Sequence, residues 1–198
     1  MSHYFIHDKS LDHAVKPYDV KIKDLMFRFY TDRGVFSKDG LDFGTRVMLE
    51  SMVIPMHAKT IIDMGCGYGP IGLYVAKTNP NLQVFMYDVN LRAVELAQKN
   101  MKENNIKNVN IKESFLFQNV DIKADVILSN LQIRAGKQTV FELYEGAYDH
   151  LNSGGYFYVV IQKKQGAPSS VTKLEALFGA CEVIEKQKGY WILLAKKA

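Results

Sequence analysis

The sequence predicts an α/β protein whose sheet is mainly parallel, with helices on both faces and an antiparallel hairpin at the C-terminal end. Three observations predict this fold. From residue 59 onward, short apolar runs alternate with amphipathic segments, an order typical of parallel strands joined by helical crossovers. A glycine-rich stretch directly follows the first apolar run. Only a Lys-Gly pair separates the last two runs, which indicates a hairpin with no helix between its strands.

The N-terminal part of the chain precedes this alternating pattern. Residues 1–17 are polar and irregular, so we expect a loose lead-in. Residues 20–32 alternate imperfectly between apolar and polar side chains, which predicts a short hairpin or paired strands. Gly34 marks a turn, and residues 41–53 have the apolar spacing of a helix.

The elements of the core follow in order along the chain. Strands are predicted at residues 59–65, 81–88, 108–114, 124–130 and 156–162. Helices are predicted at residues 70–79, 91–105, 137–152 and 169–180. Pro70 suits the first turn of its helix, Asn90 suits the N-cap of the next, and Gly154-Gly155 are expected to stop the third. Residues 181–197 are typical of two strands joined by a Lys188-Gly189 turn.

Length and composition limit the classes of protein. A chain of 198 residues suits one domain, here with an N-terminal extension over 1–33 and a core over 34–198. Two cysteines give no disulfide framework and indicate a reducing compartment. The first residues lack the apolar run of a signal peptide, and no segment has the roughly 18 apolar residues of a membrane span. We therefore expect a cytoplasmic protein without a membrane partner. The net charge of +4 permits a nucleic-acid partner without requiring one.

The strongest local signal is the glycine-rich stretch between the first core strand and its helix. Gly65, Gly67, Gly69 and Gly72 allow a tight turn and close approach of a ligand to the backbone. Asp88 ends the next strand about 20 residues later, where a carboxylate accepts hydrogen bonds from ribose hydroxyls. This pattern fits two cofactors, a nicotinamide dinucleotide and S-adenosylmethionine (SAM).

Three details favour SAM. Pro70 lacks a backbone N–H at the point where a pyrophosphate seeks donors. The negative charge of Asp63 is unfavourable beside a pyrophosphate and favourable beside the amine and sulfonium of SAM. An antiparallel C-terminal end also suits the sheet of a methyltransferase better than that of a nicotinamide-binding protein. Packing alone is a weaker explanation of the glycines, and a nicotinamide oxidoreductase remains a distant alternative.

Blocks of sequence across most of the chain carry a more specific signal. They are "GVFSKDGLDFGTR" (34–46), "IIDMGCGYGPIGL" (61–73), "DVNLRAVELAQKN" (88–100), "NLQIRAGK" (130–137) and "VIQKKQGAPS" (160–169). Together they resemble the RsmC-like family of class I SAM-dependent methyltransferases, which methylates the exocyclic amine of guanine in small-subunit ribosomal RNA. The first, fourth and fifth blocks are specific to a much smaller group of proteins than the glycine motif. They resemble short members of the family that have a single catalytic domain. The resemblance implies a Rossmann-like seven-stranded fold, SAM as cofactor and RNA as partner.

The resemblance also implies roles for individual residues. Asn130 is the implied catalytic residue and reaches both the target amine and the cofactor. The implied cofactor-binding residues are Asp63, Gly65, Cys66, Gly67, Tyr68, Gly69, Asp88, Val89, Asn90 and Phe115. The implied substrate-binding residues are Leu131, Gln132, Ile133, Arg134 and Lys137.

The chemistry of an exocyclic amine explains why the family uses asparagine. The amine is a poor nucleophile because its lone pair is conjugated into the ring. An Asn side-chain carbonyl and the following backbone carbonyl accept its two hydrogens, which favours a pyramidal nitrogen and aims the lone pair at the methyl group. Catalysis is then mostly positioning, and no general base of special pKa is required.

Two stretches of the sequence depart from the family pattern. Leu131-Gln132 stands where the family has two prolines, which would fix φ and hold the loop in shape. Phe115 stands where the family usually has an acidic residue that accepts a hydrogen bond from adenine, and Phe115 either stacks on adenine or packs. Two further hypotheses therefore stay open: a SAM- or RNA-binding protein with little transferase activity, and a methyltransferase for a small molecule or a protein.

The sequence offers no sign of other chemistry. Its five histidines and two cysteines show no spacing typical of a metal site or of a covalent nucleophile. We expect no metal cofactor.

Overall fold

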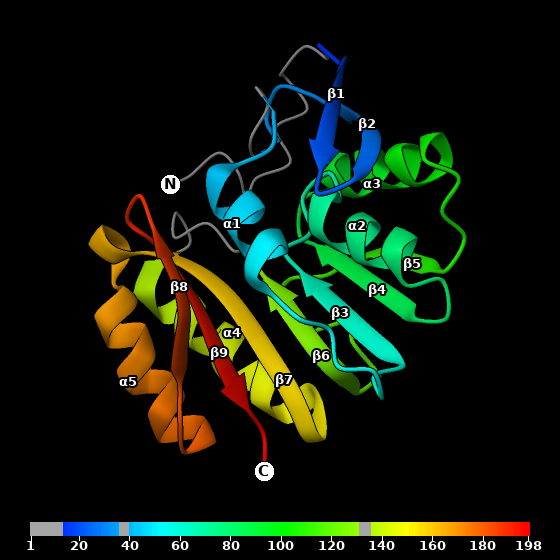
Figure 1. The fold of residues 1–198 in the computed structure, drawn as a ribbon. Coiled ribbons are helices and arrows are strands. Elements are labelled where there is room, and N and C mark those ends of the chain that lie inside the picture. The colour runs from blue at the N-terminus through cyan, green and yellow to red at the C-terminus, as the bar shows by residue number, and fades with distance from the viewer. Residues whose placement is uncertain (1–13, 36–39, 131–135) are drawn as a thin grey trace.

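The computed structural model describes residues 14–35, 40–130 and 136–198 and has a seven-stranded sheet at its centre (Figure 1). The sheet contains β3 (Thr60–Met64), β4 (Gln83–Asp88), β5 (Val109–Glu113), β6 (Ala124–Ser129), β7 (Leu151–Gln162), β8 (Glu182–Gln187) and β9 (Tyr190–Lys196). The helices are α1 (Phe43–Ser51), α2 (Pro70–Thr78), α3 (Leu91–Glu103), α4 (Gly136–His150) and α5 (Ala167–Phe178). A separate hairpin consists of β1 (Lys16–Ile22) and β2 (Leu25–Thr31).

The strand directions confirm the predicted fold class. The strand order is β5-β4-β3-β6-β7-β9-β8, and the five strands from β5 to β7 are parallel. β9 is antiparallel to β7 and β8, so its arrow opposes that of β7 in Figure 1. The predicted turn between β8 and β9 has φ angles of 46° at Lys188 and 82° at Gly189, as in a type I′ turn. The chain order reverses between β3 and β6, and ligands of such sheets bind beyond the strand ends at this point.

Apolar side chains cover both faces of the sheet. On β6, Val126 and Leu128 belong to one hydrophobic cluster, and Ile127 between them belongs to the other. This alternation is that of a strand buried on both faces. The first cluster packs against α1, α2 and α3, and the second packs against α4 and α5 (Figure 1). With both faces covered, the C-terminal ends of the strands remain for ligand binding.

The start of β7 corrects one prediction. α4 ends at His150 and β7 begins at Leu151, so Gly154 and Gly155 lie inside a strand and do not stop a helix. The pairing of β6 with β7 shifts register just after Ala124, and Gly154 has a φ of 77°. The two glycines therefore accommodate a β-bulge. Glycine is also typical of the end of a helix, so the sequence alone does not distinguish the two structures.

The hairpin of β1 and β2 confirms the predicted paired strands and starts earlier than expected, at Lys16. Asn100 of α3 and Asn104, the C-cap residue that follows α3, bind the free edge of β2. Asn100 accepts a hydrogen bond from the N–H of Tyr30 at 2.7 Å and donates one to its carbonyl at 3.1 Å. Asn104 does the same for Arg28, at 3.2 and 2.9 Å. The side-chain amides thus take the place of a neighbouring strand.

Candidate functional site

The glycine-rich loop joins β3 to α2, and its backbone shape requires glycine. Gly65, Gly67 and Gly69 have φ angles of 72°, 57° and 101°, in a region that residues with side chains rarely adopt. A Cβ added at Gly67 would have no heavy atom within 4 Å, so close packing does not explain the glycine. The loop therefore presents bare backbone to open space, as a closely bound ligand needs.

Asp88, at the end of β4, holds this loop in place. Its side chain is only 2% exposed. One carboxylate oxygen accepts a hydrogen bond from the N–H of Gly67 at 2.8 Å, and the other accepts one from the N–H of Asn90 at 2.8 Å. Asn90 accepts from the N–H of Arg92 at 3.1 Å, which confirms it as the N-cap of α3. Val89, which lies between Asp88 and Asn90 in the chain, is half-buried. One carboxylate thus fixes both the loop and the start of α3.

Asp63 lies fully buried beneath the loop. Its Oδ2 accepts a hydrogen bond from the N–H of Gly72 at 2.8 Å, whereas Oδ1 has no hydrogen-bond partner. Gly72 has to be glycine here, because a Cβ would stand 2.9 Å from Oδ2. Burial raises the pKa of Asp63 to about 7, against the lowering effect of the Gly72 N–H and together with the charge of Asp88. A positive charge on a nearby ligand would favour the ionised form.

The raised pKa of Asp63 predicts that stability falls with rising pH. The folded protein keeps this proton after the unfolded chain has lost it, so the contribution is complete below about pH 4 and lost as the pH passes about 7. Urea unfolding at several pH values between about 5 and 8 should show this decrease. Asp63→Asn does not ionise and should lack it, while Asp88 is present in both proteins. A stability difference between the two proteins that stays constant with pH would contradict the prediction.

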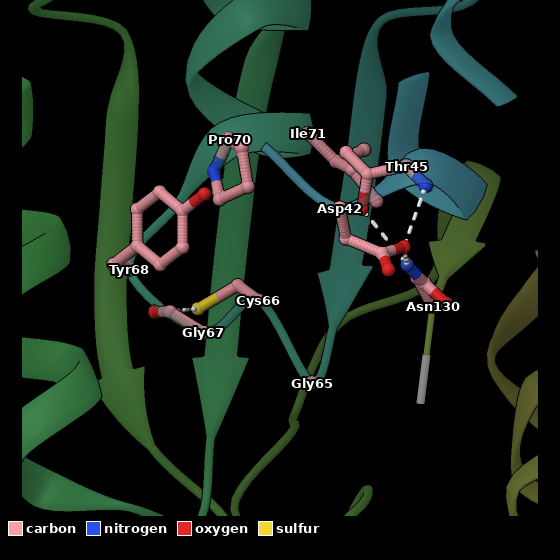
Figure 2. A pocket seen from close by; sticks show the side chains of 9 residues that line it. All are labelled: Asp42, Thr45, Gly65, Cys66, Gly67, Tyr68, Pro70, Ile71 and Asn130. Atoms are coloured by element: carbon pink, nitrogen blue, oxygen red, sulfur yellow. Dashed lines mark hydrogen bonds between the residues drawn. The ribbon is translucent and has the colours of Figure 1, made fainter. Parts of the chain in front are cut away.

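A pocket opens where the N-terminus of α1, the glycine loop and the end of β6 meet (Figure 2). It is lined by Asp42, Thr45, Gly65, Cys66, Gly67, Tyr68, Pro70, Ile71 and Asn130. The residues that we expected to bind a cofactor and that line it are Gly65, Cys66, Gly67, Tyr68 and Asn130. The expected residues that are not among its described lining are Asp63, Gly69, Asp88, Val89, Asn90 and Phe115. The pocket thus unites the glycine loop with the predicted catalytic residue.

Asn130 is held in one orientation by two residues that the sequence analysis did not single out. Its amide nitrogen donates to a carboxylate oxygen of Asp42 at 3.0 Å and to the hydroxyl of Thr45 at 2.8 Å (Figure 2). A carboxylate only accepts hydrogen bonds, so the amide group must turn its nitrogen toward Asp42. Both N–H groups are then engaged, and the carbonyl oxygen is the atom left to bind another group. Asp42 also caps α1 by accepting from the N–H of Thr45 at 3.0 Å.

The remaining predicted residues lie around the pocket or outside the described part of the chain. Phe115 is half-buried and follows Ser114, whose N–H donates to the carbonyl of Asp88 at 2.9 Å. It therefore lies beside the end of β4. Lys137 is exposed in the first turn of α4, and its Nζ lies 5.2 Å from the centre of the Phe141 ring. The expected substrate residues Leu131, Gln132, Ile133 and Arg134 lie outside the described residues.

Among the described residues, neither a metal-binding cluster nor a membrane-spanning helix is present. Over the described ranges, no group of three or more His, Cys, Asp or Glu side chains is arranged to hold a metal ion. In that same part of the chain, none of the helices combines the length and apolar character needed to cross a membrane.

Comparison with known proteins identifies the family of this chain and several of its relatives. A family model described as the methyltransferase small domain matches residues 26–194. The uncharacterized protein YbxB of Bacillus subtilis is 44% identical over 197 residues, which cover 98% of either chain. The ribosomal RNA small subunit methyltransferase C of Acinetobacter baylyi is 30% identical over 194 residues, which cover 95% of this chain and 56% of that protein.

A solved structure shows the same fold. It is that of the T. thermophilus 16S rRNA N2 G1207 methyltransferase (RsmC) in complex with AdoMet and guanosine. The TM-score is 0.82 at 23% sequence identity, and the match covers 93% of this chain and 51% of that one. The chain thus spans about half the length of these two methyltransferases, whereas it matches YbxB over nearly its whole length.

Proposed function

This chain belongs to the methyltransferase small domain family and is an RsmC-like class I SAM-dependent methyltransferase, and from that premise we propose that it methylates the exocyclic amine of guanine in small-subunit ribosomal RNA. The observation that carries the proposal is the fixed amide of Asn130 in the pocket beside the glycine loop. RNA as the partner is supported by relatives named for ribosomal RNA and by the guanosine in the T. thermophilus complex. The proposal includes a cytoplasmic location, because that is where a ribosomal RNA substrate would be met.

The described residues fit SAM as the cofactor. Gly67 leaves open space beside the loop backbone. Asp88 ends β4, 21 positions after Gly67 in the chain, which is the place of a carboxylate that binds ribose hydroxyls. When Asp63 is ionised, its unpartnered oxygen suits a cationic ligand and would repel a pyrophosphate. Pro70 begins α2 without an N–H for such a phosphate group.

The proposed role of Asn130 follows from its orientation. Bound SAM supplies an electrophilic methyl group. The carbonyl oxygen of Asn130 accepts one hydrogen of the target amine, and the backbone carbonyl that follows, outside the described residues, accepts the other. These two bonds fix the nitrogen with its lone pair toward the cofactor. Asp42 and Thr45 prevent the Asn130 side chain from turning its nitrogen to the amine, because their acceptor atoms hold that nitrogen on the opposite side.

The proposal is tested by two measurements on the same protein. Calorimetry measures SAM binding, and labelled SAM measures methyl transfer to small ribosomal subunits that lack methylation. We expect binding, transfer, and methylated guanosine after digestion of the RNA. Absence of SAM binding would contradict the cofactor assignment, and labelling of another nucleoside would contradict the target.

A second candidate function is a SAM- or RNA-binding protein with little transferase activity. The observation that favours it is Leu131-Gln132 in place of two prolines, since leucine and glutamine leave the loop backbone freer than proline does. Binding of SAM with no transfer to RNA would support this candidate. Transfer to a small molecule or to a protein would instead support a methyltransferase with a changed substrate.

A further inference from the structure

A second open pocket, here called the lysine groove, lies at the same edge of the sheet as the Asn130 pocket. It is lined by Gln162, Lys163, Lys164, Lys188, Gly189 and Tyr190. These residues come from the end of β7, from η2 (Lys163–Gln165), from the turn between β8 and β9, and from the first position of β9. None of the described lining residues is acidic, so the groove offers three ammonium groups to an anionic ligand without an opposing charge in its wall.

The walls of the lysine groove are fixed by local contacts. The N–H of Lys163 donates to the carbonyl of Gly189 at 2.8 Å, which joins the two loops that carry the lysines. The Nζ of Lys188 lies 4.8 Å from the centre of the Phe43 ring, a cation–π distance. The side chain of Gln162 donates to the hydroxyl oxygen of Tyr190 at 2.7 Å. The hydroxyl hydrogen of Tyr190 is thus left to donate to a ligand in the groove.

The start of α1 forms a wall between the lysine groove and the Asn130 pocket. The Phe43 ring packs against the Tyr190 ring with centres 5.8 Å apart, and a Cβ on Gly44 would stand 2.6 Å from that ring. Asp42 and Thr45, directly before and after them, bind Asn130. Of these four consecutive residues, two contact Asn130 and the other two contact Tyr190, so the two sites are neighbours along the start of α1.

We propose that the lysine groove binds the phosphodiester backbone of the RNA next to the nucleotide whose base enters the Asn130 pocket. This inference rests on the proposed function, because a base that reaches Asn130 brings its flanking phosphates to the same edge. Lysines bind phosphate as point charges and position an RNA without reading its sequence. Lys163, Lys164 and Lys188 supply the charges, and Tyr190 supplies one oriented hydroxyl donor.

The test compares two triple variants with the same change of charge. One carries Lys163→Ala, Lys164→Ala and Lys188→Ala in the groove. The control carries Lys59→Ala, Lys107→Ala and Lys123→Ala, which replace exposed lysines just before β3, β5 and β6, at the opposite edge of the sheet. Binding of the wild type and both variants to small-subunit RNA is measured from low to high salt. The groove variant should reduce the slope of log Kd against log salt by about three, because each phosphate contact accounts for about one.

Further readouts separate this inference from the proposed function. SAM binding and kcat at saturating RNA should be unchanged in the groove variant, with the loss appearing in RNA affinity. Tyr190→Phe should weaken RNA binding roughly two- to tenfold, as loss of one hydrogen bond does, with the salt slope kept.

An equal loss in the control variant, or an unchanged slope in the groove variant, would overturn the inference. Loss of affinity for anionic lipid vesicles without loss for RNA would also overturn it. Because RNA binding is measured without transfer, an inactive wild type would refute only the proposed function.

Discussion

Replacing Asn130 with alanine is expected to lower kcat for methyl transfer to RNA by about 10²–10³-fold, the usual effect of removing one positioned hydrogen-bonding group from an active site. The carbonyl oxygen of Asn130 is the acceptor that fixes the target amine, and alanine has none. SAM affinity should change little, because the glycine loop and Asp88 keep their contacts. The measurements are transfer kinetics with labelled SAM and calorimetry of SAM binding.

A matched pair at Thr45 controls for general disruption of the site. Thr45→Val removes the hydroxyl that accepts from the Asn130 amide at 2.8 Å, and it should lower kcat roughly tenfold because the amide is then held by one bond. Thr45→Ser keeps the hydroxyl and should stay near the wild-type rate. An Asn130→Ala protein with the wild-type kcat would refute the assigned role. A large loss of SAM affinity in that protein would show that the contact of Asn130 with the cofactor, which the family resemblance implies, contributes strongly to SAM binding.

Replacing Asp88 with alanine is expected to raise the Kd for SAM by about 10²-fold, since two hydrogen bonds from ribose hydroxyls to a charged group together account for about 3 kcal/mol. The replacement also removes the acceptor for the N–H groups of Gly67 and Asn90, so the loop loses part of its support. In contrast to Asn130→Ala, the loss should appear in SAM affinity, and kcat should recover at saturating SAM.

Calorimetry of Asp88→Ala and of a control variant tests this prediction. Asp149→Ala removes an exposed carboxylate in the last turns of α4 and should bind SAM as the wild type does. A Kd for Asp88→Ala within about twofold of wild type would mean that the carboxylate only holds the N–H of Gly67 in the loop and the N–H of Asn90 at the start of α3.

Local signals in the sequence predicted most of the fold. The Lys188-Gly189 turn, the glycines with positive φ and the Asn90 cap each depend on a few neighbouring residues, so the pattern of the chain is enough to predict them. Gly154-Gly155 was misinterpreted for the same reason: a β-bulge and a helix end both use glycine. The choice between them depends on the pairing of β6 with β7, which is not local.

Contacts between distant residues were beyond prediction. Asp42 and Asn130 are 88 positions apart, and Asn100 and Tyr30 are 70 apart. Nothing in the local pattern of Asp42 distinguishes a residue that only caps α1 from one that also orients a side chain of another element. The two buried aspartates show the same limit. Their positions were predicted, whereas their hydrogen bonds to the N–H groups of Gly67 in the loop and Gly72 in α2 became visible only in the folded chain.

The asparagine contacts of α3 join the N-terminal hairpin to the glycine loop. Asn100 donates from one amide nitrogen to the carbonyls of Tyr30 and Tyr68, at 3.1 and 2.8 Å, and the hydroxyls of Tyr18 and Tyr68 lie 2.6 Å apart. Part-buried polar contacts therefore cross the expected boundary between residues 33 and 34. We infer that hairpin and loop open together in native-state hydrogen exchange as one cooperative unit, so that a fragment without the hairpin would lose the order of its glycine loop.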